Sequence, residues 1–197
     1  MSVARRLSTR LRSLVLVALT SVPLLVLAWV GAPSLGAAAE SVSFGPHDVH
    51  SAFHVEKSEN KNEVHYAVRV DAACRPQGKT PVFGYWRRLK KGVRVDEPLT
   101  GPGVRVYGAS GEQTVTTTPS GGRVTMYVKA LKRLLVDIQI DKSKTGCVAV
   151  PHVKLKGEQA RLSFAFLQLG RFGLTVKYVD VWGFRERDNL KVTEQFR

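Results

Sequence analysis

Histidine and glutamate side chains gather in one stretch of the chain, between residues 49 and 71. The stretch holds three of the five histidines, His50, His54 and His65, together with Glu56 and Glu63. Two imidazoles and a carboxylate can bind a divalent cation such as zinc. They can also work as an acid–base pair, because a neighbouring carboxylate moves the histidine pKa into the working pH range. These residue types are therefore compatible with a hydrolase or a metal-binding protein.

The same stretch alternates between polar and apolar residues, as half-buried antiparallel strands do. We predict strands over residues 49–57 and 63–71, joined by the polar turn at residues 58–62. In such a hairpin His54 stands opposite His65 or one step away. The competing interpretation is that the histidines merely occupy the solvent-facing side, where Ala52 and Ala67 would hold neither metal nor substrate. The core-facing side is predicted to carry Ser51, Phe53, Val55, Val64, Tyr66 and Val68.

Known catalytic and cofactor signatures are not recognised in the sequence. There is no GxSxG motif, no serine, histidine and acid in a recognisable order, and no phosphate-binding glycine loop. The histidines also do not have the spacing of a known metal motif, so we assign no metal and no cofactor. His54, Glu56 and His65 remain the candidates for catalysis, and His50, His54 and His65 the candidates for a metal. The sequence therefore favours a binding protein over an enzyme.

Basic residues form a second group of candidates. The chain carries 30 Lys and Arg against 16 Asp and Glu, a formal charge of +14. Clustered at predicted turns, they would attract an anionic membrane surface, lipopolysaccharide or an acidic glycan. The alternative is that these residues are simply solvated. The candidate binding residues are Arg87, Arg88, Lys90, Lys91, Lys132 and Arg133.

Residues 1–39 have the features of a secretory signal peptide. Four arginines precede an apolar run at residues 14–30, and Ala37-Ala38-Ala39 offers a cleavage site. An uncleaved anchor formed by residues 14–30 is the alternative, since the run is nearly long enough to span a bilayer. We therefore expect residues 40–197 to be periplasmic or secreted, or else membrane-anchored. Export argues against nucleic acid as the partner.

Only two cysteines are present, Cys74 and Cys147. An oxidising compartment favours a disulfide between them, although two separate buried thiols are the alternative.

Aromatic residues offer one further possibility, a platform on which a sugar ring stacks. The alternation of Trp182 with Val176 and Tyr178 instead favours a packed core. The candidates for such a platform are Tyr85, Trp86, Phe172, Trp182 and Phe184.

Short strands separated by turn residues continue to the end of the chain. We expect a loop at residues 93–103, which contain Pro98 and Pro102, then a short extended piece at 104–107, and no long helix. The fold predicted for residues 40–197 is a single all-β domain, an antiparallel β-sandwich or flattened barrel of about eight to ten short strands. The later predicted strands are residues 81–89, 113–118, 123–129, 134–140, 147–155, 160–169, 174–184 and 190–196.

The segments FHVEKSENKNEVHYAVRVD, PVFGYWRRL and VRVYG resemble the bacterial family catalogued as domain of unknown function 4833. The resemblance is densest at residues 53–108, and the SENKN turn is its most specific part. It implies a single, often exported domain and assigns no activity, cofactor or catalytic residue. The match is weakest at residues 100–106, where glycine and proline disfavour a helical connection. We therefore expect a non-enzymatic envelope module that binds an anionic surface, a glycan or a protein partner. A hydrolase or metal-binding protein using the hairpin is the alternative.

Overall fold

A computed structural model describes residues 42–57, 60–109, 112–131, 134–170 and 175–197. These residues form eleven β-strands, one short α-helix and one 3₁₀ turn. In chain order the elements are β1 (Val49–Lys57), β2 (Asn60–Val68), β3 (Val82–Lys90), β4 (Val93–Pro98), α1 (Pro102–Tyr107), β5 (Thr114–Thr118), β6 (Gly121–Val128), η1 (Lys129–Leu131), β7 (Leu134–Ser143), β8 (Gly146–Leu155), β9 (Glu158–Leu169), β10 (Val176–Arg185) and β11 (Lys191–Phe196).

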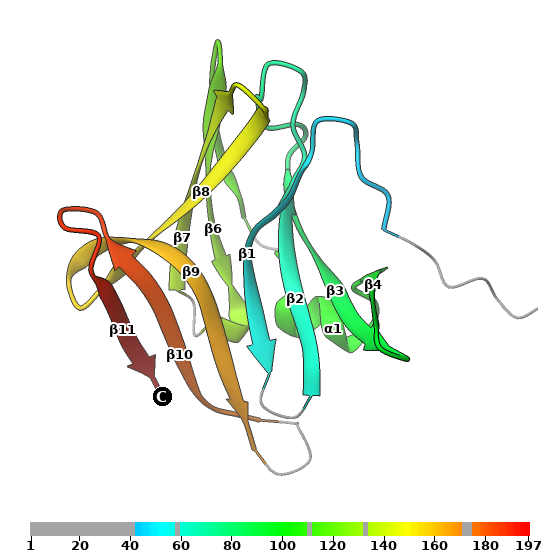
Figure 1. The fold of residues 1–197 in the computed structure, drawn as a ribbon, viewed down its shortest axis with the longest axis vertical. Coiled ribbons are helices and arrows are strands. Elements are labelled where there is room, and N and C mark those ends of the chain that lie inside the picture. The colour runs from blue at the N-terminus through cyan, green and yellow to red at the C-terminus, as the bar shows by residue number, and fades with distance from the viewer. Residues whose placement is uncertain (1–41, 58–59, 110–111, 132–133, 171–174) are drawn as a thin grey trace, which may run out of the picture. The chain divides into compact units, whose positions relative to one another are not determined.

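All of these strands belong to one mixed sheet that is not closed into a barrel. The order is β4-β3-β2-β1-β9-β8-β7-β6-β5, and β10 pairs with β9 and β11 outside this path. The long strand β9 is the branch point. Its first residues pair with β8, its later residues pair with β1, and β10 runs along its other edge. Figure 1 shows the two groups of strands, β1–β4 and β6–β8, diverging from β9.

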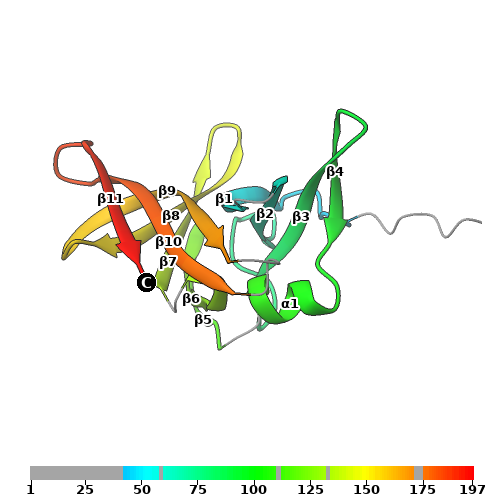
Figure 2. The same ribbon diagram turned by 90° about the horizontal axis from the view of Figure 1, so that it is seen from below.

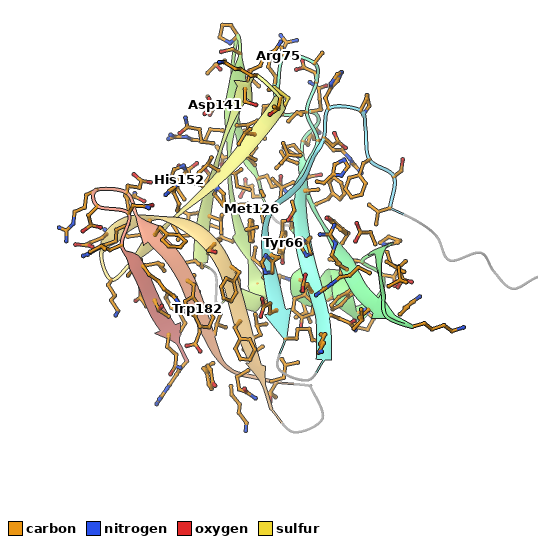
Figure 3. All side chains as sticks on the ribbon, viewed as in Figure 1. Tyr66, Arg75, Met126, Asp141, His152 and Trp182 are labelled. Carbon is orange, nitrogen blue, oxygen red and sulfur yellow. A yellow bond between two sulfur atoms is a disulfide. The ribbon has the colours of Figure 1, made fainter. Side chains whose placement is uncertain are left out.

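A single hydrophobic cluster takes side chains from both groups of strands. Tyr66 on β2 is completely buried, and its ring stacks on Phe53 of β1 with centroids 4.4 Å apart. Figure 3 labels Tyr66 together with Met126 of β6, which belongs to the same cluster. The alternation that predicted the core face of the first hairpin is therefore confirmed at its central positions: Phe53, Val55, Val64, Tyr66 and Val68 are all buried.

The expectation of a mostly β domain is confirmed, but its architecture differs from the one predicted. The strands form one open sheet and neither a β-sandwich nor a flattened barrel. One pair, β1 with β9, is parallel, whereas a purely antiparallel sheet was expected. Residue 54 of β1 pairs with residue 164 of β9, and local alternation carries no information about a partner so distant in the chain.

The segment expected to be a loop and an extended piece is instead strand β4 followed by helix α1. Pro102 begins the helix, a position where its missing N–H costs no hydrogen bond and its fixed φ suits the first turn. Gly103 follows it, and a Cβ at that position would lie only 3.2 Å from Nε1 of Trp86. The proline and glycine that argued against a helix are thus the residues that start it and let it approach the sheet.

Cys74 and Cys147 form a disulfide, as predicted, with Cα atoms 5.3 Å apart. The bond joins the turn after β2 to the start of β8, and so connects the two groups of strands. Its presence indicates an oxidising compartment. The described residues contain no helix that is long and apolar enough to cross a membrane. The predicted signal peptide and the alternative anchor at residues 14–30 lie outside the described residues and stay predictions.

Candidate active site

The two central histidines of the first hairpin meet across adjacent strands. His54 of β1 is paired in register with His65 of β2. Their ring centroids are 5.1 Å apart and their planes are inclined by 14°. Both rings lie on the sheet face opposite Tyr66 and Val55, which are buried in the core. The cross-strand contact between the histidines is the one that the hairpin register predicts.

The histidine pair is part of a row of stacked rings that crosses five strands. His65 is flanked by Tyr85 of β3, with centroids 5.6 Å apart. On the other side His54 stacks on Phe164 of β9, and Phe164 stacks on Trp182 of β10, at 5.6 and 4.6 Å. Figure 3 labels Trp182 on β10 at the outer end of this row. Because the rings cover one another's faces, mainly their edges are left for a ligand, which does not suit sugar stacking.

Ser51 joins His65 through an irregularity in β1. The strand advances from Val49 to Phe53 while its partner moves back only from Val68 to Tyr66. This register shift turns Ser51 toward the histidine face, where its Oγ lies 2.7 Å from Nδ1 of His65. Strict alternation had placed Ser51 on the core side, and that expectation is wrong. A β-bulge re-aims side chains in this way.

The second ring nitrogen of His65 is held by Glu63, two residues earlier on β2. Nε2 of His65 and Oε2 of Glu63 are 2.7 Å apart, and the other carboxylate oxygen is paired with Arg94 at 2.5 Å. A carboxylate can only accept a hydrogen bond, so Nε2 carries the proton when the imidazole is neutral. Nδ1 is then the unprotonated nitrogen, and it accepts the hydroxyl hydrogen of Ser51.

The protonation states of His65 and Glu63 follow from their surroundings. Burial lowers the pKa of His65 below its ordinary value, and the charges of Arg87 and His54 lower it further, against the opposing effect of Glu63. Burial opposes ionisation of Glu63, but hydrogen bonds from His65 and Arg94 outweigh it, so the pKa of Glu63 is also lowered. At neutral pH the site therefore contains a neutral imidazole and an ionised carboxylate.

Tyr85 lies beside the His65 ring on the side that faces away from His54. The ring is fully buried, and its hydroxyl donates to the carbonyl of His50 at 2.8 Å. Arg87 donates to the same hydroxyl at 3.1 Å and forms a bidentate pair with Asp96. Burial raises the pKa of Tyr85 to about 12, so the phenol stays neutral. The imidazole of His65 is thus supported by rings on both sides.

The remaining histidine-site candidates do not converge on His65. Glu56 accepts from Nε2 of His54 at 3.3 Å, and His50 stacks on Phe44 with centroids 4.3 Å apart. Both nitrogens of His65 are already occupied by Ser51 and Glu63. Across the described part of the chain, no group of three or more His, Cys, Asp or Glu side chains is arranged to hold a metal ion.

Three of the candidate anion-binding residues are ion-paired with the neighbouring strand β4. Arg87 pairs with Asp96, while Arg88 and Lys90 both pair with Glu97. Lys91 is exposed at the β3–β4 turn, and Lys132 and Arg133 lie outside the described residues. The acids of β4 reduce the positive charge that would attract an anionic partner to β3, so binding at this place stays a prediction.

The aromatic candidates lie in different places. Trp86 is buried beneath α1, and Phe184 is exposed on β10. Trp182 was expected to pack in the core with its alternating neighbours, but the buried residues of β10 are Val179, Val181 and Gly183, and Trp182 lies on the opposite face. Phe172 is outside the described residues. The structure does not bring these rings together as one platform.

The segment that forms this site falls within a match to a known protein family. Residues 53–195 match the model of the family described as Domain of unknown function (DUF4833). The chain belongs to the DUF4833 family. No curated protein and no solved structure matches the chain significantly. His54, Glu63 and His65 lie within the DUF4833 segment, whereas Ser51 precedes it by two residues.

Sequence reasoning found the two histidines but missed the serine. Glu63 was placed on the correct face, but its hydrogen bond to His65 was not anticipated. One local signal for Ser51 exists: Ala52 and Phe53 are consecutive apolar residues, which breaks the alternation of the strand. Ala52 packs against the hydrophobic core in the structure, as Phe53 does.

Proposed function

We propose that this protein is an exported acyl hydrolase that uses Ser51 as nucleophile and His65 as general base. The single observation that carries the proposal is the hydrogen-bonded series Ser51–His65–Glu63, with 2.7 Å at each step. A nucleophile in contact with a base, and a base oriented by a carboxylate, is the arrangement that activates a serine hydroxyl.

The geometry supports each role separately. The Ser51 hydroxyl is on an exposed residue, so a substrate carbonyl can approach it. His65 is 6% exposed and has a lowered pKa, which keeps it neutral and able to accept a proton at neutral pH. Glu63 accepts the hydrogen of Nε2 and so selects the tautomer in which Nδ1 is unprotonated. The ring is used in the reverse sense of the common triad, in which the serine contacts Nε2 and the acid contacts Nδ1.

The reaction consistent with this arrangement is ester hydrolysis through an acyl-enzyme. Oγ of Ser51 attacks the ester carbonyl carbon while its proton passes to Nδ1 of His65. The bond from the carbonyl carbon to the leaving oxygen then breaks, and His65 returns the proton to the departing alcohol. A water molecule, deprotonated by His65, hydrolyses the acyl–Ser51 ester and restores the free hydroxyl.

Labelling with a fluorophosphonate, which reacts with activated serines, tests this function. We expect the full-length protein to be modified at Ser51, as identified by mass spectrometry of its peptides. Ser51→Ala abolishes the labelling, and His65→Gln slows it by about 10²-fold or more. Ser163→Ala is the matched control, because Ser163 is also exposed on the sheet. Labelling that persists in Ser51→Ala, or a folded wild-type protein that is not labelled, would contradict the proposal.

A second function, binding to an anionic envelope surface, is supported by a different observation. Lys142 near the end of β7 and Lys144 in the β7–β8 turn are both exposed. Such lysines attract anionic headgroups or glycans at low ionic strength. We expect sedimentation with vesicles containing anionic lipid to decrease with added salt and with Lys142→Gln plus Lys144→Gln. Equal sedimentation with neutral vesicles would rule this function out.

A further inference from the structure

An aromatic side chain from the start of the described chain lies across the sheet face that carries His65. Phe44 stacks on His50 of β1, with ring centroids 4.3 Å apart and planes inclined by 19°. On its other side the Phe44 ring lies 5.3 Å from the ring of Tyr85 and 6.0 Å from that of Phe83, both on β3. Because β2 runs between β1 and β3, the ring of Phe44 covers β2.

The residue of β2 beneath this ring is Ala67, whose register partner on β3 is Phe83. Figure 2 shows β1, β2 and β3 as neighbouring strands, with α1 on their core side. Ala67 alternates with Tyr66 and Val68 of the core, so its methyl group faces the opposite side. Ala67 is nevertheless completely buried, and the ring of Phe44 accounts for this cover. The ring seat consists of Ala67 and the rings of His50, Phe83 and Tyr85.

The proposed nucleophile Ser51 borders the ring seat. It lies in the irregular part of β1, whose counterpart on β2 is Ala67. His50, one wall of the seat, directly precedes Ser51 in the chain. Tyr85, another wall, flanks the ring of His65 with centroids 5.6 Å apart. A group bound in the seat is therefore next to the pair formed by Ser51 and His65.

The segment that carries Phe44 is attached to the sheet by a turn behind the ring. Residues 42–45, where the described chain begins, belong to no helix or strand. The turn is held by Asp48, whose carboxylate accepts the N–H of Gly45 at 2.8 Å and that of Val70 at 3.2 Å. Rotation of residues 42–44 about this turn removes the ring from the seat without breaking the pairing of any strand.

We propose that the ring seat is a substrate subsite for an aromatic group, and that Phe44 occupies it in the resting protein. The inference rests on the proposed hydrolase function and names its substrate class, an ester that carries a phenyl ring. The seat already holds such a ring, between three aromatic side chains at distances typical of favourable ring contacts. A substrate ring that replaces Phe44 gains the same burial beside Ser51, whereas an acetyl ester of a small alcohol does not.

Hydrolysis of ethyl phenylacetate, benzyl acetate and ethyl acetate by the full-length protein tests this subsite. The first ester carries the ring on the acyl side, the second on the alcohol side, and the third has no ring. Phe44→Ala vacates the seat, and we expect it to raise kcat/KM for one of the two phenyl esters about tenfold relative to ethyl acetate. The ester that gains shows on which side of the scissile bond the seat lies. Phe184→Ala is the matched control, because Phe184 is an exposed phenylalanine on β10, outside the seat.

A second substitution fills the vacated seat. Ala67→Leu combined with Phe44→Ala should return the ratio of the rates to its wild-type value, while fluorophosphonate labelling of Ser51 shows that the double variant is folded. An unchanged ratio in Phe44→Ala, a gain that persists with Ala67→Leu, or an equal gain in Phe184→Ala would overturn the subsite and leave the hydrolase function in place. A wild-type protein in which Ser51 is not labelled and none of the three esters is hydrolysed would overturn both.

Discussion

His54 and His65 lie directly opposite each other with ring centroids 5.1 Å apart, but their hydrogen bonds differ. His65 uses both ring nitrogens, one with Ser51 and one with Glu63. His54 contacts Glu56 through Nε2 and is the more exposed of the two. A positive charge on His54 opposes protonation of His65, and only His65 is positioned to deprotonate Ser51.

This relationship predicts that His54→Gln raises the pKa of His65. The charge of protonated His54 contributes to the lowered pKa of His65, and the substitution removes it. The titration of the His65 ring C–H signals by NMR measures the change. His152→Gln is the control, since His152 is paired with Glu186 and belongs to a different part of the sheet. A His65 pKa that is unchanged or lower in His54→Gln would contradict the expectation.

Folding stability should decrease below pH 6.5 because of His65. Its pKa in the folded protein is lower than the ordinary value of 6.5, so the unfolded chain binds more protons in the window between the two values. The contribution of His65 to the free energy of unfolding is fully present above pH 6.5. It decreases as the pH falls below that value, by up to about 1.4 kcal/mol per pH unit. Urea unfolding at a series of pH values measures the slope. His65→Gln should flatten it, and an unchanged slope would exclude His65 as the cause.

Removing the disulfide should destabilise the protein by about 4 kcal/mol, the chain-entropy value for a loop of this length. Cys74 and Cys147 are 73 residues apart, and their bond joins the turn after β2 to the start of β8. Cys74→Ser plus Cys147→Ser is compared with the wild-type protein under oxidising and reducing conditions. The wild type should approach the stability of the double variant only when reduced. If the wild-type protein had equal stability under oxidising and reducing conditions, the disulfide would not be formed.

Gly121→Ala should be strongly destabilising. A Cβ at this position would lie 2.1 Å from the backbone oxygen of Ile140 on the paired strand β7, and neither strand can shift without breaking the ladder. We expect a loss of about 2 kcal/mol or more in urea unfolding. Ser120→Ala, in the same turn and exposed, is the matched control. A cost similar to that of Ser120→Ala would show that the strands separate more easily than this packing implies.

Alternation along the first hairpin was sufficient to predict its core face and the contact between His54 and His65. Side chains of a strand alternate with a fixed period, and an antiparallel partner a few residues away has few possible registers. The cysteine pairing was also accessible from composition, because an exported chain with two cysteines has one possible bridge. The family resemblance agreed with these expectations and added no chemistry to them.

The features that could not be predicted from the sequence share one physical reason. Each depends on a departure from local periodicity or on a partner that is distant in the chain. The register shift in β1 turned Ser51 toward His65, and no pattern within the strand shows how large the shift is. The parallel pairing with β9 brought Phe164 beside His54 from more than a hundred residues away. Packing against Trp86 made a helix from residues whose glycine and proline suggest a loop. The sequence alone therefore determined the hairpin and its histidines, and the tertiary structure decided that a serine stands beside them.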